Sequence, residues 1–423
     1  MTAGRARART TRRKSATRKL DLRTGRTVWQ ARPAPAIPKA RLPTDRTTEV
    51  LVIGAGISGA LIAEALTDAG LEVLVVDRRG PLAGSTAATT ALIQYELDMP
   101  IVKLARRIGQ ARAERLWRRS RLAVEALGDR MQRLRIGAEQ VARDTLYLEG
   151  SELDRAGLLA EQAARRRAGL ETDFLEARDV LRRFGIRRRA ALHSSGGFCV
   201  EPRRLAAGFL NAALRRGATL CAPAEVTRVQ PGRRMVRATT KDGPVIRCRH
   251  LVFASGYEMP TAAPTKGQCI RSTWVIATAP QRREPWEGSA MISEAAEPYL
   301  YLRTTPDRRI ICGGEDEDFA DEARRDAKLP EKTATLSRKL AALLPGVDAR
   351  PAFAWCGSFG TSRNSTPTIG RLPRMPNCYA ALGYGGNGIT FAMMAAQMLR
   401  GLVTGGGDPD LDLVSFRSSR KSR

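Results

Sequence analysis

Three glycines at positions 54, 56 and 59 form a G-x-G-x-x-G turn, a spacing that suits the phosphates of a nucleotide. Gly54 allows the tight turn, Gly56 lets the main chain approach a pyrophosphate, and Gly59 lets a helix pack closely on a strand. Asp77 follows 18 residues after Gly59, where a carboxylate can accept hydrogen bonds from a ribose diol. These residues predict a dinucleotide-binding site.

Such a turn needs a strand before it and a helix after it. Residues 50–53 are branched and apolar, as in a strand buried on both faces. Apolar residues then recur at helical spacing up to Gly70, which favours a helix end, and residues 71–76 form a second apolar run. The helix N-terminus would offer free N–H groups and a positive dipole to phosphates. The order of these elements predicts an α/β, Rossmann-like unit.

Two further glycine turns lie later in the chain. Ser255-Gly256 ends an apolar run at residues 251–254, where the main chain can approach a dinucleotide closely. Gly383, Gly385 and Gly388 repeat the G-x-G-x-x-G spacing, but no strand with a terminal acid follows them. We expect a loop against which a flat ring lies, with the N-terminus of a helix from Ile389 directed at the ring. That N-terminus would stabilise the negative charge of a reduced flavin, whereas a nicotinamide has no comparable need.

Composition narrows the class of protein. A chain of 423 residues can form two domains with a large core. No apolar run reaches the roughly 18 residues of a membrane span, and the start lacks the apolar region of a secretory signal. The seven cysteines form no C-x-x-C pair, which favours reduced thiols in the cytoplasm over disulfides or zinc. With two histidines, a histidine-rich metal site is excluded, and no metal is expected.

The net charge of +28 is densest at the N-terminus. Residues 1–46 hold 14 lysines and arginines against two aspartates, which leaves +16 for the rest of the chain. We expect a basic, largely disordered tail there. Attraction to nucleic acid or an anionic surface is the alternative, but no aromatic residue interleaves the charges of the first twenty residues to stack on bases. A solvated tail is the favoured interpretation.

Several stretches in a fixed order now point to one family. They are GAGISG with Asp77, GSTAATTALIQYE, GGFCVEPRRL, VFASGYE, YLYLRTTPDRRIICGGEDE and LGYGGNGIT, over roughly residues 47–405. In this order they resemble the D-amino-acid oxidase superfamily of FAD-dependent oxidoreductases, which includes glycine oxidase, sarcosine oxidase and the D-amino-acid dehydrogenases. The resemblance implies FAD, and a discontinuous Rossmann-like FAD-binding domain with an inserted α+β substrate domain built on an antiparallel sheet.

On this basis the chain divides as follows. Residues 1–46 are expected as the tail, residues 47–105, 196–262 and 353–405 as the FAD-binding domain, residues 106–195 and 263–352 as the substrate domain, and residues 406–423 as a C-terminal tail. The residues expected to bind FAD are Gly54, Ala55, Gly56, Ile57, Ser58, Gly59, Asp77, Arg78, Arg79, Ser85, Thr86, Thr89, Thr90, Val226, Ala254, Ser255, Gly256, Gly383, Gly385, Gly386, Asn387, Gly388, Ile389 and Thr390. Sarcosine oxidases attach flavin through a cysteine near Cys356, but Cys356 aligns about one residue away, so non-covalent FAD is expected.

A substrate pocket is predicted around residues 299–303. In an alternating strand Tyr299, Tyr301 and Arg303 share one face. An arginine binds a carboxylate with two parallel hydrogen bonds, and Arg303 matches the arginine that holds the substrate carboxylate in the glycine oxidase branch. The acidic run at residues 315–318 could attract an ammonium group, although a solvated loop is the favoured interpretation.

The resemblance implies that an amine or amino acid loses a hydride from its α-carbon to flavin N5, with oxygen or a quinone as the electron acceptor. The flavin supplies the redox chemistry, so no histidine base is needed. Two alternatives stay open. One is a flavoprotein acting on modified tRNA, which the charge favours and the missing aromatic platform does not. The other is a catalytically silent FAD-binding scaffold.

Overall fold

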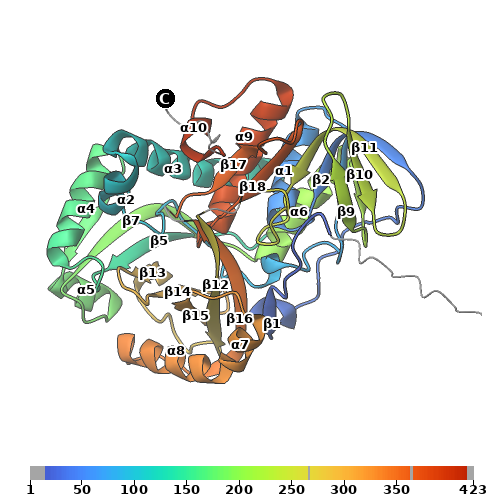
Figure 1. Cartoon of the computed structure of the whole chain (residues 1–423). Helices are drawn as coiled ribbons and strands as arrows, with labels where there is room; N and C mark the ends of the chain where they lie inside the picture. Colours follow the sequence, from blue (N-terminus) through green and yellow to red (C-terminus); the bar gives the residue numbers. More distant parts are fainter. Residues whose placement is uncertain (1–14, 265–266, 363–364, 417–423) are drawn as a thin grey trace, which may run out of the picture.

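The computed structural model describes residues 15–264, 267–362 and 365–416. Over these residues the chain forms two sheets, of eight and ten strands, with helices packed on both. Figure 1 shows the smaller sheet with α1 and α6 on one side of the molecule and the larger sheet on the other. The fold class is therefore α/β with a Rossmann-like part and a second, largely antiparallel part, as the sequence predicted.

The smaller sheet contains the predicted nucleotide-binding unit. Its strands β18, β11, β2, β3 and β8 are parallel, and β17 pairs with β18 in the antiparallel direction. A hairpin of β9 and β10 pairs with the start of β11. The strands are β2 (Arg46–Ile53), β3 (Val73–Val76), β8 (Thr219–Cys221), β9 (Val226–Gln230), β10 (Val236–Thr240), β11 (Val245–Phe253), β17 (Thr368–Arg371) and β18 (Cys378–Leu382).

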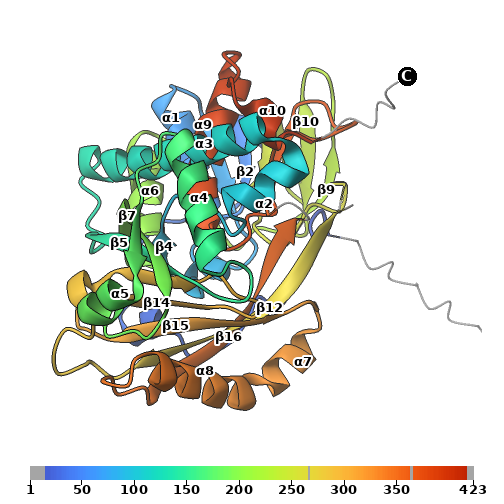
Figure 2. The same cartoon turned by 90° about the vertical axis from the view of Figure 1, so that its left-hand side faces the viewer.

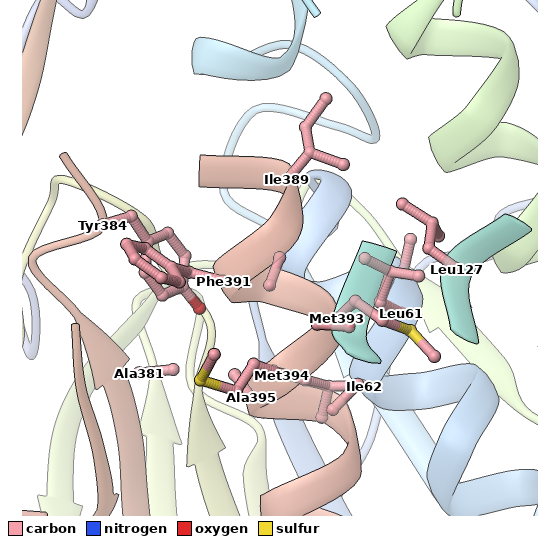
Figure 3. Close-up of a cluster of buried hydrophobic side chains, with 14 of the residues drawn as sticks. Leu61, Ile62, Leu127, Ala381, Tyr384, Ile389, Phe391, Met393, Met394 and Ala395 are labelled. Carbon is pink, nitrogen blue, oxygen red and sulfur yellow. The ribbon is translucent and has the colours of Figure 1, made fainter. Parts of the chain in front are cut away.

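Alternate residues of β2 and β3 enter two different cores, as buried parallel strands do. Val50 and Val52 face the helices α1 (Ile57–Asp68), α6 (Pro202–Arg215) and α9 (Gly388–Thr404). Figure 3 shows this core, in which Leu61 and Ile62 of α1 meet the methionines of α9. Leu51 and Ile53 face the other side, which the β9–β10 hairpin covers. The turn after β2 is thus fixed by packing on both faces.

The larger sheet runs in the order β1, β16, β12, β15, β14, β13, β5, β7, β4, and β6 pairs with β7. All of these pairs are antiparallel except β13 with β5. The strands are β1 (Arg23–Gly25), β4 (Leu92–Ile93), β5 (Val141–Leu148), β6 (Asp173–Glu176), β7 (Ala190–Cys199), β12 (Gln268–Thr278), β13 (Met291–Glu294), β14 (Leu300–Thr304), β15 (Ile310–Glu317) and β16 (Pro351–Ser362).

Helices cover both faces of this sheet. The helix α8 (Leu329–Leu343), with α7 (Glu322–Ala327) before it, packs Leu336 and Leu340 against Trp274 of β12. The helices α2 (Ile101–Ile108), α3 (Gln110–Arg133) and α4 (Arg155–Arg167) lie on the opposite side (Figure 2). The other short helices are α5 (Ala177–Phe184), α10 (Leu411–Val414) and the 3-10 turns η1 (Val28–Ala31), η2 (Ser85–Ala87) and η3 (Glu287–Ser289).

The N-terminal segment corrects the prediction of a disordered tail. Residues 15–46 pack on the protein: β1 pairs with β16, and Trp29 is 3% exposed. Sequence patterning missed this because the segment is held by pairing with a strand more than 300 residues away, not by a periodic apolar face of its own. Residues 1–14 of the predicted tail lie outside the described residues.

The predicted domain boundaries also differ from the sheets. The strand β16 belongs to the larger sheet along its length, although its residues from 353 were assigned to the FAD-binding domain. The helix α3, assigned to the substrate domain, packs against α9. At the predicted C-terminal tail, Asp410 pairs with Arg115 of α3 at 2.8 Å, and Leu413 and Val414 are buried, so this part of the chain packs on the protein. Residues 417–423 lie outside the described part of the chain. Among the described helices, none is long and apolar enough to cross a membrane.

Candidate functional site

The glycine turn after β2 forms the floor of a cleft. Gly54 has φ +117°, a conformation that side chains rarely adopt. A Cβ on Gly59 would stand 1.8 Å from the Gly54 carbonyl oxygen, so helix α1 can approach the turn only with glycine there. Gly56, the residue before α1, has no side chain that could accept hydrogen bonds from the first N–H groups of the helix. Main-chain donors at this N-terminus therefore face the cleft.

Polar side chains surround the turn. The Thr86 hydroxyl accepts a hydrogen bond from the Ile57 N–H at 3.0 Å. The Asp77 carboxylate accepts from the main-chain N–H of Ala55 at 2.9 Å and of Gly80 at 2.9 Å. Asp77 thus ties the turn to the end of β3 and still lines the cleft, where the ribose of a dinucleotide would meet it.

Most of the predicted FAD-binding residues line this cleft of about 150 Å³. They are Gly54, Gly56, Ile57, Ser58, Asp77, Arg78, Arg79, Ser85, Thr86, Thr89, Val226, Ala254, Ser255, Gly256, Gly386, Gly388 and Ile389. Thr90, Gly385 and Asn387 line only the neighbouring cavity. The remaining four line neither: Ala55 and Gly59 shape the turn from behind, Gly383 makes a turn with φ +68°, and the Thr390 hydroxyl donates to the Gln94 carbonyl at 3.0 Å.

The N-terminal segment lies across one side of the cleft, where Thr17 and Leu22 contribute to its lining. Arg79 pairs with Glu258 at 2.7 Å, and the same carboxylate accepts the Leu20 N–H at 2.8 Å. Hydrogen bonding to these partners, against the effect of burial, lowers the pKa of Glu258. The two arginines predicted to bind FAD are therefore partly neutralised by an acid of the adjacent loop.

A second, larger cavity of about 320 Å³ lies between the glycine loop after β18 and the larger sheet. It adjoins the cleft, because five residues line both: Ser85, Thr89, Tyr257, Gly386 and Ile389. Tyr257 donates to the Gly385 carbonyl at 3.5 Å and so lies against the glycine loop. A molecule in the cleft and one in the cavity can therefore meet at this junction.

Tyr299 and Tyr301 line the cavity together, as predicted, with ring centroids 5.7 Å apart. Gly313 on the neighbouring strand makes room for Tyr301, since a Cβ there would stand 2.4 Å from the phenol. Tyr299 donates to the Asp316 carboxylate at 3.0 Å. Burial raises the pKa of Asp316 to about 6, although the bond from Tyr299 opposes the shift.

Asp316 corrects the interpretation of residues 315–318 as a solvated loop. These residues extend β15 to Glu317, and Asp316 is only 7% exposed and lines the cavity. The strand could not be recognised from the sequence, because four consecutive acids are typical of a solvated loop. Its pairing with β12 is also irregular between Ser272 and Trp274.

Arg303 is not in the cavity, which differs from its expected role as carboxylate anchor. It is 2% exposed, and its guanidinium donates to the carbonyl oxygens of Ala91 at 2.9 Å and Val200 at 3.0 Å. Burial lowers the pKa of this arginine. Strand alternation predicted which face of β14 carries Arg303. It could not predict that residues 90–91 cover this end of the strand and separate Arg303 from the cavity. Arg303 holds the cavity wall from behind.

Arg303 is one of three buried donors to consecutive carbonyl groups of residues 88–91. Trp355 donates its indole N–H to the Ala88 carbonyl at 2.8 Å, and Trp29 donates to Thr89 at 2.8 Å. Arg303 binds the carbonyls of Thr90 at 3.1 Å and of Ala91. Residues 88–91 line the cavity, and Thr89 lines the cleft as well. These donors therefore fix the wall between the cleft and the cavity.

Asp98 lies on the other side of the cavity, in the loop before α2. Its carboxylate accepts the Gly386 N–H at 2.8 Å, and its accessible surface faces the cavity. Burial among the surrounding protein raises its pKa, against the bond from Gly386 and the nearby Arg271. The Asn387 amide donates to the Glu96 carbonyl at 2.8 Å and so fixes the same loop.

Three features of the cleft suit a dinucleotide. Its floor is main chain at which added side chains would clash, a helix N-terminus offers N–H groups, and the acid Asp77 lies beside the turn. The family described as FAD dependent oxidoreductase matches residues 49–402 of the sequence. The chain belongs to this family. The cofactor of this oxidoreductase is therefore FAD.

Solved structures share the fold. Glycine oxidase from Geobacillus kaustophilus is 18% identical with a TM-score of 0.69, covering 86% of this chain and 96% of its own. L-proline dehydrogenase from P. horikoshii is 19% identical with a TM-score of 0.70, covering 86% and 95%. L-amino acid deaminase from Proteus vulgaris is 15% identical with a TM-score of 0.70, covering 90% and 99%. No curated protein matches the sequence. At these identities the likeness establishes the fold of the FAD-dependent oxidoreductase.

Several cavity residues of this oxidoreductase were not predicted from the sequence. Asp98, Tyr147, Tyr257, Arg271 and Trp355 line the cavity from five separate elements or loops. Asp98 had a detectable signal, since it closes the GSTAATTALIQYELD stretch that follows the first nucleotide-binding unit. Tyr257 also had one, since it lies in the VFASGYE stretch. Tyr147, Arg271 and Trp355 carry no local pattern, because only the pairing of distant strands brings them together.

Proposed function

We propose that this FAD-dependent oxidoreductase oxidises an amine or an amino acid at its carbon–nitrogen bond. The observation that carries the proposal is the junction of the cleft with the cavity through five shared residues. A substrate in the cavity would there meet the redox end of a cofactor held in the cleft. The amine- and amino-acid-oxidising titles of the structural neighbours agree with this reaction class.

The FAD would be held by the main chain of residues 54–59, by Asp77 at the ribose and by the glycine loop at residues 385–388. When bound, FAD supplies a two-electron acceptor. The substrate loses a hydride from its carbon and a proton from its nitrogen, and water then converts the imine to a carbonyl compound and a released amine or ammonia. Tyr299, Tyr301 and Tyr257 would orient the substrate. Burial raises the pKa of Tyr301, so this phenol stays a neutral hydrogen-bond donor at neutral pH.

We further propose that the FAD is not covalently attached. Cys356 directs its sulfur at the Thr24 carbonyl, 3.8 Å away, and at Asp326, while the neighbouring Trp355 lines the cavity. A thiol on the opposite face of the strand cannot reach a ring in the cavity. All seven cysteines are free, which supports a cytoplasmic location.

Amine-dependent turnover of the purified holoenzyme tests the function. Glycine, sarcosine, D-amino acids, proline and simple amines would each be supplied with oxygen, and separately with a quinone. We expect one of these classes to give hydrogen peroxide, or quinone reduction, together with a carbonyl product. A holoenzyme that turns over none of them with either acceptor contradicts the proposal.

A further inference from the structure

The cavity is acidic in a chain that is strongly basic. Among the described residues, six carboxylates and two guanidinium groups line it, whereas the whole chain has a net charge of +28. The acids are Glu96, Asp98, Glu152, Glu294, Glu297 and Asp316, and the bases are Arg165 and Arg271. A cavity lined by negative charge attracts cationic ligands, even when the protein as a whole is positively charged.

Four of these acids already have cationic partners. Glu294 pairs with Arg188 at 2.6 Å and Glu297 with Arg271 at 2.9 Å. Glu96 lies 3.6 Å from Arg165, and Glu152 pairs with Lys103. The two that remain are Asp98 and Asp316, neither of which has an ion-pair partner among the residues that the structure describes. They form the unbalanced charge of the cavity.

The two unpaired carboxylates are built into the cavity wall in different ways. Asp316 is buried, with one oxygen bound by Tyr299 at 3.0 Å and the other, Oδ1, without a hydrogen-bond partner among the described residues. Asp98 is held by the Gly386 N–H at the junction with the cleft. A buried carboxylate oxygen without a partner is costly, and an ammonium group is the ligand that satisfies it.

Among the residues that the structure describes, no cation that lines the cavity is free to bind a substrate carboxylate. Arg303 is bound to main-chain carbonyls outside the cavity. Arg271 lines the cavity, but Glu297 at 2.9 Å and Asp318 at 2.6 Å both pair with it. Bidentate binding of a carboxylate would have to displace these partners.

We propose that the substrate is a dicationic amine, a diamine whose two nitrogens are recognised by Asp98 at the junction and by Asp316 with Tyr299 on the sheet. The inference rests on the proposed amine oxidation and names its substrate class. The nitrogen beside Asp98 is the one next to the reacting carbon, because Gly386 belongs to both the cleft and the cavity.

Calorimetry on the FAD-loaded protein tests the inference with diaminobutane and, as the matched monoamine, butylamine. We expect diaminobutane to bind at least about tenfold more tightly, since a hydrogen bond between charged groups contributes that much. Asp316→Asn should remove this preference and leave butylamine unchanged. Glu317→Gln is the matched control, because Glu317 lies on the same strand but pairs with Lys328 and Lys332 outside the cavity.

Tyr299→Phe gives a second test that keeps the carboxyl group and the packing. It should weaken diaminobutane binding severalfold, because the lost hydrogen bond also raises the pKa of Asp316. Equal binding of the two amines, or tighter binding of glycine, sarcosine or lysine than of diaminobutane, overturns the inference. Anaerobic bleaching of the flavin separates the two proposals. Bleaching by carboxylated substrates alone contradicts the diamine inference and leaves amine oxidation intact, whereas diamine binding without any bleaching contradicts the proposed function.

Discussion

Asp316 is the residue whose ionisation matters most in the cavity, because its pKa of about 6 lies near physiological pH. Tyr299 donates to it, Thr273 and Arg271 on β12 also favour its charged form, and Glu297 disfavours it. Below pH 6 the carboxyl group is neutral and attracts no cation. Above pH 6 it is charged.

We therefore expect the affinity for diaminobutane to rise as the pH increases from 5 to 7, with a midpoint near 6. Calorimetry at several pH values measures this, and Asp316→Asn should remove the rise centred near pH 6 while Glu317→Gln keeps it. The pH dependence of stability has the opposite sign to that of binding. The pKa of Asp316 in the folded protein exceeds the unfolded value of roughly 3.9. Asp316 therefore contributes on the order of 3 kcal/mol to the free energy of unfolding below that value, and this contribution is lost as the pH rises through 6. A pH-independent affinity in the unsubstituted protein would contradict this assignment.

Single residues also mark where sequence reasoning succeeds. Gly54, Gly56 and Gly59 were predicted correctly as the turn, because their roles depend on neighbours within one βαβ unit. Arg303 and Asp316 were misplaced, because a strand pattern gives the face of a residue and not what the next strand or loop covers. The sequence thus predicts local sites well and cavities built across a sheet poorly.

The element that most clearly links fold and site is the segment of residues 88–91. Its carbonyl groups receive hydrogen bonds from Trp355 of β16, Trp29 of η1 and Arg303 of β14. The guanidinium carbon of Arg303 also stands 5.5 Å from the centre of the Trp29 ring. The N-terminal segment is therefore part of the structure that holds the cavity wall.

Trp29→Ala should lower the free energy of unfolding by about 3–5 kcal/mol, since it removes a buried indole. It should also weaken FAD binding, because Thr89 lines the cleft. Trp29→Phe keeps most of the packing and should cost only about 1 kcal/mol for the lost hydrogen bond. Chemical denaturation and FAD titration measure both effects. If Trp29→Ala changes neither quantity, the segment only rests on the surface.

The predicted elements of the nucleotide-binding unit agree with the structure closely, from β2 through α1 to β3. The N-terminal segment could not be predicted, because β1 is three residues long and pairs with a strand near the other end of the chain. Short strands of this kind have no periodicity to detect. Their order in the sheet is set by long-range packing.

At the scale of the whole molecule, a basic surface surrounds an acidic cavity. The arginines of α3 are held by acids near the C-terminus: Asp412 pairs with Arg112 at 2.8 Å, and Asp408 lies 3.4 Å from Arg119. These pairs fix α3 to the segment that follows α9. The excess positive charge therefore lies outside the cavity, where it does not compete for a cationic ligand.

The reactivity of the seven cysteine thiols tests which parts of the fold are buried. Six are buried and Cys269 is exposed. We expect one thiol to react rapidly with a thiol reagent in the native protein and seven in denaturant, because buried thiols are protected and their pKa values are raised by burial. A count of six in denaturant, with yellow colour retained on the protein, would show that one cysteine is bonded to the flavin.

The most direct test of the central claim is anaerobic titration of the purified, FAD-loaded protein with amines, followed by the flavin absorbance. Amine oxidation predicts complete bleaching at one equivalent of substrate per FAD, with diaminobutane more effective than butylamine. A protein that binds FAD but is bleached by no amine or amino acid, or one that cannot bind FAD, would contradict the claim.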